Sequence, residues 1–375
     1  MEELEKTENI AINPKNPFQN KTEFEVYNSD YGEIVPQIRL EGCEIPLLPN
    51  SREKSRIRRY YNIVGGFLLG HMALTQVLFL VFGEAFLFFI SLADGAKMTL
   101  PENYHSLAWD YFSNSSSYSA LVMLCIAGCS ILATWLGCSA TKIPISTLFQ
   151  TRDFTALTAV SYIMIALFLQ LLTGWASIGI EELMEGVGIQ PYDPPDSDYS
   201  DIKTLLLDFI YGVIVAPITE ELLVRGFVLK NLSRVSQRFG IIMSAFFFGV
   251  WHENIPQFIL AFTVGCFFGY ITVKHNSLVP SILAHISINF CATLFQILET
   301  YKLDIASEIF NGFYMILVLG GIVFLIKMLI TERFPCSLPE QSERSMRLAL
   351  TSPLLMGVLI CHIGTIVYTI IEENS

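Results

Sequence analysis

Residues 218–226 read Ile-Thr-Glu-Glu-Leu-Leu-Val-Arg-Gly, which places two adjacent carboxylates, Glu220 and Glu221, inside a long apolar run. A charge at the centre of a membrane helix costs about 3 kcal/mol or more, so such residues usually have a function. Glu221 and Arg225 are four residues apart with the acid first, the favourable order for an ion pair on one helix face. Glu220 lies about 100° around the helix from Glu221 and must be met by other helices or by water. The spacing predicts a neutralised Glu221 and a Glu220 left for chemistry, with a purely structural ion-pair cluster as the alternative.

The composition is that of a membrane protein. Of the 375 residues, 52% are hydrophobic and 15% are charged, and the mean hydropathy is +0.50. Soluble domains have roughly 25% charged residues. The net charge is −12, so the chain lacks the excess of basic residues typical of a nucleic-acid-binding protein, and no nucleic-acid partner is expected. The eight cysteines do not follow the spacing of a zinc knuckle or of a disulfide framework.

Nine apolar runs follow the polar N-terminal segment, and most reach the ~20 residues that a helix needs to cross the hydrocarbon core. The fold class predicted is therefore all-α, a polytopic membrane helical bundle with about nine transmembrane helices. The short exception is Ile241 to Trp251, whose helix either extends into the flanking residues or ends inside the bundle. The runs are Ile63 to Leu92, Tyr118 to Ala140, Phe154 to Ala176, Thr204 to Leu229, Ile241 to Trp251, Gln257 to Val273, Leu278 to Leu298, Ile309 to Ile330 and Leu348 to Ile370.

Charges in the connecting segments predict the orientation and the domain limits. Ser51 to Arg59 carries five Lys and Arg residues just before the first run, so the N-terminus is expected in the cytoplasm. The acidic connector after the third run is expected outside. We divide the chain into a polar cytoplasmic tail (1–59), N-terminal transmembrane helices with the acidic outer loop (60–200), a central core (201–300) and C-terminal transmembrane helices (301–375).

Two further clusters place polar groups on neighbouring runs. Phe248-Gly-Val-Trp-His252 puts His252 one turn beyond Phe248, and His285-Ile-Ser-Ile-Asn289 puts a histidine and an amide on one helix face. At 1.5 Å per residue, Glu220, His252 and His285 lie about 14, 16 and 10 Å from the inward ends of their runs. The three helices are therefore predicted to present these groups to one wet cavity in the inner half of the membrane.

Together these residues resemble the EExxxR, FxxxH and HxxxN motifs of the CPBP intramembrane proteases. That family, also called Abi, includes the type II CAAX prenyl endopeptidases and bacterial proteins linked to bacteriocin self-immunity. The resemblance covers roughly Thr204 to Gln296 and includes the segments Gly265 to Tyr270 and Ser277 to His285. It makes residues 201–300 the CPBP protease core.

The resemblance also implies roles for the motif residues. Glu220 and His252 would activate water, and a carboxylate in a low-dielectric pocket gains the basicity this needs. His285 and Asn289 would donate to the oxyanion of the tetrahedral intermediate. Glu221 and Arg225 would have a structural role, as an ion pair that stabilises the site.

The need for a metal is open at this point. Two histidines and a glutamate can hold zinc with an open position for water, which gives His252, His285 and Glu220 as the zinc variant. The HExxH zincin motif is missing, because the residues after His252 are Glu-Asn-Ile-Pro. The side-chain amide of Asn289 is better suited to donate a hydrogen bond to an oxyanion than to bind zinc. A glutamate mechanism without a metal or other cofactor is therefore favoured.

The sequence thus predicts an intramembrane endopeptidase that hydrolyses a peptide bond of a lipidated, leader-peptide or membrane-protein substrate. Its partners are that substrate and the lipid bilayer, its location is a bacterial cell membrane, and its oligomeric state stays open. One alternative is a transporter or channel that uses the same polar groups as an ion relay. Another is a non-catalytic immunity or regulatory membrane protein.

Overall fold

The computed structural model describes the whole chain except residues 1–50, 95–115, 152–153, 191–201, 333–338 and 375. Its described elements are helices, with no β-strand among them, so the predicted all-α class is confirmed. Most of the predicted N-terminal tail and the proline-containing part of the acidic loop lie outside the described residues. The basic segment 51–59, by contrast, is the first part of a long helix.

Eight helices of the described residues are long and apolar enough to cross a membrane. The fifth predicted run is the exception, as expected, because the helix there has only 15 residues. The long helices, in chain order, are α2 (Ser51–Asp94), α4 (Ser116–Ala140), α5 (Ala156–Gly186), a composite helix over Ile202–Leu232, α10 (Ile255–His275), α11 (Val279–Thr300), α12 (Asp304–Thr331) and α14 (Pro353–Glu373), and the short one is α9 (Gln237–Trp251). The other elements are the 3₁₀ turn η1 (Ile145–Thr147) and the helix α13 (Pro339–Leu350).

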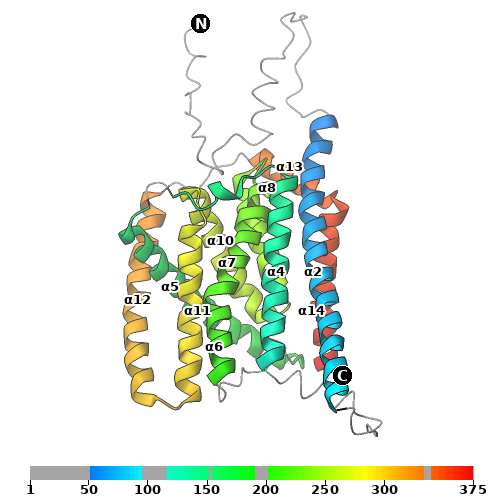
Figure 1. Ribbon diagram of the computed structural model, residues 1–375. Coiled ribbons are helices and arrows are strands. Elements are labelled where there is room, and N and C mark those ends of the chain that lie inside the picture. Colours follow the sequence, from blue (N-terminus) through cyan, green and yellow to red (C-terminus); the bar gives the residue numbers. More distant parts are fainter. Residues whose placement is uncertain (1–50, 95–115, 152–153, 191–201, 333–338, 375) are drawn as a thin grey trace, which may run out of the picture.

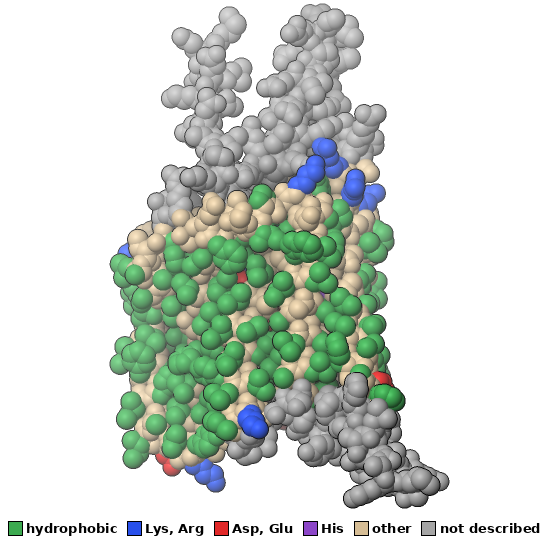
Figure 2. All heavy atoms as spheres, in the orientation of Figure 1, with side chains coloured by type: hydrophobic (Ala, Val, Ile, Leu, Met, Phe, Trp, Pro, Cys, Tyr) green, Lys and Arg blue, Asp and Glu red, His purple; other side chains and the backbone are tan. Residues whose placement is uncertain are grey.

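The helices stand side by side in one bundle (Figure 1). The first and last long helices, α2 and α14, pack together on one side, and α5 packs with α12 on the other. In α10, 56% of the most apolar window is buried, against 17% in α14, so α10 is a central helix. Figure 2 shows hydrophobic side chains over the lateral face and charged side chains mainly at its two ends. Exposed apolar residues such as Trp175 and Ile330 fit contact with lipid rather than water.

Two apolar cores meet at the predicted motifs. One core joins α2, α9 and α14 to the composite helix, and the other joins α5, α10, α11 and α12. A small cluster of Val224, Phe248 and Ala261 shares its neighbour Trp251 with the first core. The motif residues therefore sit where the two halves of the bundle pack against each other.

Short capped connections set the positions of α9 and α10. Ser236 accepts a hydrogen bond from Phe239 N and begins α9, and Asn254 accepts one from Gln257 N and begins α10. Only the turn 252–254 separates the two helices, so they run antiparallel as neighbours. His252 stands in this turn.

Candidate active site

The two glutamates lie in a short α-helical piece between two π-helical turns. This piece is α7 (Ala216–Glu221), preceded by α6 (Ile202–Ile210) and η2 (Tyr211–Val215) and followed by η3 (Leu222–Leu229) and α8 (Lys230–Leu232). π-Helical turns often occur at functional sites because they rotate side chains out of the regular α-helical register. The two π-helical turns flank Pro217, which lies in the first turn of α7.

The predicted ion pair between Glu221 and Arg225 is present. Arg225 Nη1 donates to Glu221 Oε1 over 2.8 Å, and both side chains are fully buried. Arg225 Nη2 also donates to Gly265 O over 3.3 Å. The guanidinium carbon lies 4.4 Å from the ring centre of Phe248, which is a cation–π distance. The pair is thus held by charge, by a backbone carbonyl and by an aromatic ring.

His285 lies close to both carboxylates, one at each of its ring nitrogens. Its Nδ1 lies 3.1 Å from Glu221 Oε1, and its Nε2 lies 3.7 Å from Glu220 Oε2. A carboxylate only accepts, so Nδ1–H donates to Glu221. The Glu220 side chain is 27% exposed while that of Glu221 is fully buried. Glu220 is therefore the accessible carboxylate of the pair, on the side of His285 that faces away from the ion pair.

His252 is fixed by its own helix and by Phe248. His252 Nδ1 lies 2.8 Å from Phe248 O, and a carbonyl only accepts, so Nδ1 carries the proton. The neutral imidazole then has its lone pair on Nε2, the form a general base requires. The Phe248 ring contacts both histidines, with centroids 4.9 Å from His252 and 5.8 Å from His285. Phe248 thus spaces the two imidazoles and orients one of them.

Asn289 contacts the helix that carries Glu220. Its Nδ2 donates to Gly212 O over 2.7 Å. In a π-helical turn each N–H donates to the carbonyl five residues back, as Ala216 N does to Tyr211 O. Pro217 has no N–H, so the same pattern leaves Gly212 O without a backbone donor. Asn289 supplies that donor with one hydrogen of its Nδ2, and the second hydrogen is left for its predicted oxyanion role.

We expect Asn289→Ala to lower the free energy of unfolding by about 1–3 kcal/mol, because Gly212 O then loses its donor. Thermal unfolding in detergent measures the loss. Pro217→Ala restores a backbone N–H, so the same Asn289 substitution should cost less in that background. An Asn289→Ala variant as stable as the wild-type chain would contradict the structural contact and favour a role limited to the oxyanion.

The zinc variant requires His252, His285 and Glu220 to converge on one point. Both Nδ1 atoms face protein acceptors, Phe248 O and Glu221 Oε1, so only the Nε2 atoms of the two rings could bind a metal. Within the described part of the chain, no three His, Cys, Asp or Glu side chains are grouped so as to hold a metal ion. The geometry therefore does not fit that zinc set, and the metal-independent mechanism stays a prediction.

The sequence reasoning missed the contribution of α10 to this site. Phe268 lies 5.3 Å from the His285 ring and 5.5 Å from the Arg225 guanidinium carbon. A Cβ on Gly265 would lie 3.2 Å from Arg225 Nη2, so a glycine there lets the guanidinium reach the backbone of α10. The sequence feature that could have indicated this contribution is the pair Gly265 and Gly269, because small residues four apart let membrane helices approach closely.

A comparison with known protein families matches the segment that carries this site. Residues 202–291 match the family described as type II CAAX prenyl endopeptidase, Rce1-like. The match includes all the motif residues and leaves out α2, α12 and α14. No curated protein and no solved structure gave a significant match. Residues 202–291 are therefore similar to the Rce1-like type II CAAX prenyl endopeptidase family, which is consistent with the CPBP resemblance of the motifs.

Proposed function

We propose that this protein is an intramembrane endopeptidase that cleaves prenylated C-terminal CAAX tails. The observation that carries the proposal is the contact of His285 with both Glu221 and Glu220, within the segment that matches the CAAX endopeptidase family. CAAX tails end in a prenylated cysteine followed by three residues. A lipid-anchored peptide of this kind reaches a site inside a membrane bundle from the bilayer.

In the proposed reaction, Glu220 and His252 act on water. The water oxygen attacks the peptide carbonyl carbon, and its proton passes to Glu220 or to the lone pair on His252 Nε2. The carbonyl oxygen becomes the oxyanion of a tetrahedral intermediate. The C–N bond then breaks as the same proton reaches the leaving amine, which gives a carboxylic acid and a free amine.

His285 is the proposed donor to the oxyanion, in a defined protonation state. Its Nδ1–H donates to Glu221, so donation from Nε2 requires the imidazolium form. Glu221 and Arg225 then have a second role, because they orient the imidazole as a buried carboxylate does in hydrolase triads.

His285 lies toward the basic end of α2. His285 is six residues, or about 9 Å, from the start of α11, which lies at the same end of the bundle as the start of α2 (Figure 1). The exposed Lys54, Arg56 and Arg59 mark that end as cytoplasmic by the positive-inside rule. We therefore place cleavage in the cytoplasmic half of the membrane.

A peptide-release assay tests the proposal. We expect purified protein in liposomes to release the C-terminal tripeptide from a farnesylated CAAX peptide, and to leave the unprenylated peptide intact. Mass spectrometry of the products gives the cleaved bond. Cleavage of a bacteriocin leader peptide in preference to the prenylated one would overturn the substrate class, and no cleavage of any peptide would overturn the protease assignment.

A further inference from the structure

The turn that carries His252 contains a residue in the left-handed backbone region. Glu253 has φ +55°, which residues other than glycine adopt uncommonly. Backbone hydrogen bonds hold the turn on the α9 side, from His252 N to Gly249 O and from Glu253 N to Val250 O. A residue in this region stays there only when its surroundings hold it.

A histidine from the last helix holds this residue. His362 Nδ1 of α14 donates to Glu253 Oε1 over 2.9 Å, and the His362 side chain is only 6% exposed. The partners are 109 residues apart in sequence. This hydrogen bond connects the turn to α14, a helix outside the segment that matches the family. We call it the tether.

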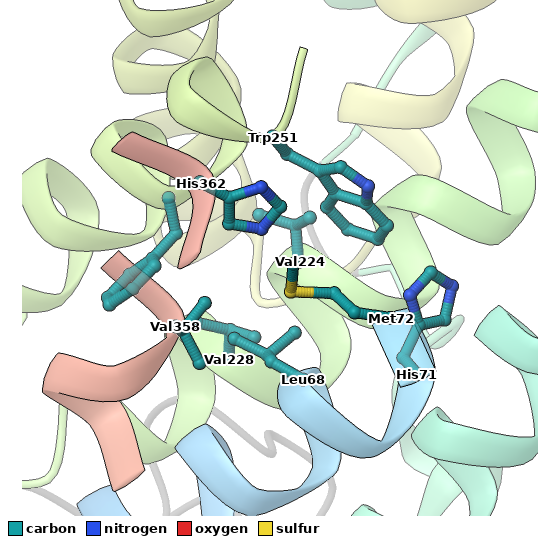
Figure 3. Close-up of a pocket in the computed structure, with 9 residues that line it drawn as sticks. Leu68, His71, Met72, Val224, Val228, Trp251, Val358 and His362 are labelled. Atoms are coloured by element: carbon teal, nitrogen blue, oxygen red, sulfur yellow. The ribbon is translucent and has the colours of Figure 1, made fainter. Parts of the chain in front are cut away.

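A second histidine contacts the other neighbour of His252. The His71 ring of α2 lies 4.9 Å from the Trp251 ring, edge to face, and His71 Nε2 lies 3.0 Å from Ser130 Oγ of α4. Figure 3 shows His362, Trp251 and His71 around one pocket between α2, α14 and η3. Residues 251 and 253 are thus each held by a terminal helix, one on each side of His252.

We propose that His362 is a positioning residue for His252 and acts through Glu253. The inference rests on the proposed function, in which His252 Nε2 must reach the attacking water. His362 fixes the carboxylate of Glu253, and Glu253 fixes the backbone from which the His252 ring projects. Releasing the tether lets the turn leave its left-handed conformation, which moves the imidazole without removing it.

The test compares two substitutions of His362 with a control on the same helix. His362→Leu removes the donor, whereas His362→Asn keeps an N–H close to the position of Nδ1. Cys361→Ala changes the adjacent lipid-exposed position. We expect His362→Leu to lower kcat for the prenylated peptide by about tenfold to 100-fold with KM little changed, because small misplacements of catalytic groups have effects of this size. His362→Asn should restore most of kcat, and Cys361→Ala should match the wild-type chain.

A second measurement does not depend on activity. Hydrogen exchange of the peptide covering residues 249–256 should become faster in His362→Leu and return toward wild type in His362→Asn. Glu253→Gly accepts the positive φ without strain but lacks the carboxylate, so it should show the same loss of kcat.

The outcomes separate the two proposals. An inactive wild-type chain whose turn still exchanges faster in His362→Leu would reject the protease function and leave the tether standing. A wild-type chain that cleaves, with His362→Leu equally active and its turn equally protected, would reject the positioning role. A fall in Tm and kcat that His362→Asn does not restore would also reject it and indicate a packing role.

Discussion

Glu220→Gln is expected to lower the rate of peptide cleavage by about 10²–10⁴-fold, the usual contribution of a general acid–base group. Glutamine has nearly the same shape and can still face His285 Nε2, but it cannot take a proton from water. The Glu220 side chain is 27% exposed and its nearest described charged partner is 3.7 Å away, so the fold should tolerate the change. Tripeptide release from the prenylated peptide gives the rate, and thermal unfolding gives Tm.

A matched substitution separates this effect from a general loss of charge. Glu299, near the end of α11, is exposed, and Glu299→Gln should leave both rate and Tm unchanged. An active Glu220→Gln variant would remove the proposed catalytic role. Ion or solute flux in sealed vesicles that disappears on Glu220 substitution, without proteolysis, would instead support the transporter alternative.

Much of the fold follows directly from the apolar runs. A membrane helix must bury its backbone polar groups within itself, so each run of ~20 apolar residues predicts one helix. The short run Ile241 to Trp251 likewise became a 15-residue helix. The ion pair of Glu221 with Arg225 was predictable for the same reason, because it depends only on spacing along a single helix.

Contacts that depend on a second helix were not predictable. The π-helical register beside Pro217 puts Gly212 O opposite Asn289, and nothing in the local spacing specifies that partner. Likewise, the shared contact of His285 with both glutamates depends on how α11 packs against α7. The motif spacing therefore indicated which residues form the candidate site but left the pairing of donors and acceptors open.

Arg225→Met is expected to lower the free energy of unfolding by about 3–5 kcal/mol, the usual cost of removing one partner of a buried ion pair. Glu221 would remain fully buried with His285 as its remaining described charged neighbour. The Phe248 ring would also lose the cation above it. Thermal or denaturant unfolding in detergent micelles measures the change, and Arg59→Met at an exposed position of α2 is the control.

Adding Glu221→Gln to Arg225→Met removes both charges of the pair and should recover much of the lost stability. Activity should not return, because the double variant no longer offers the Glu221 carboxylate that accepts from His285 Nδ1 and orients the ring. This split between recovered Tm and absent cleavage distinguishes an ion pair that also orients His285 from one that only joins helices. A double variant that cleaves the prenylated peptide at the wild-type rate would show that the pair has no part in the reaction, and a single variant with wild-type Tm would show that it adds nothing to the fold.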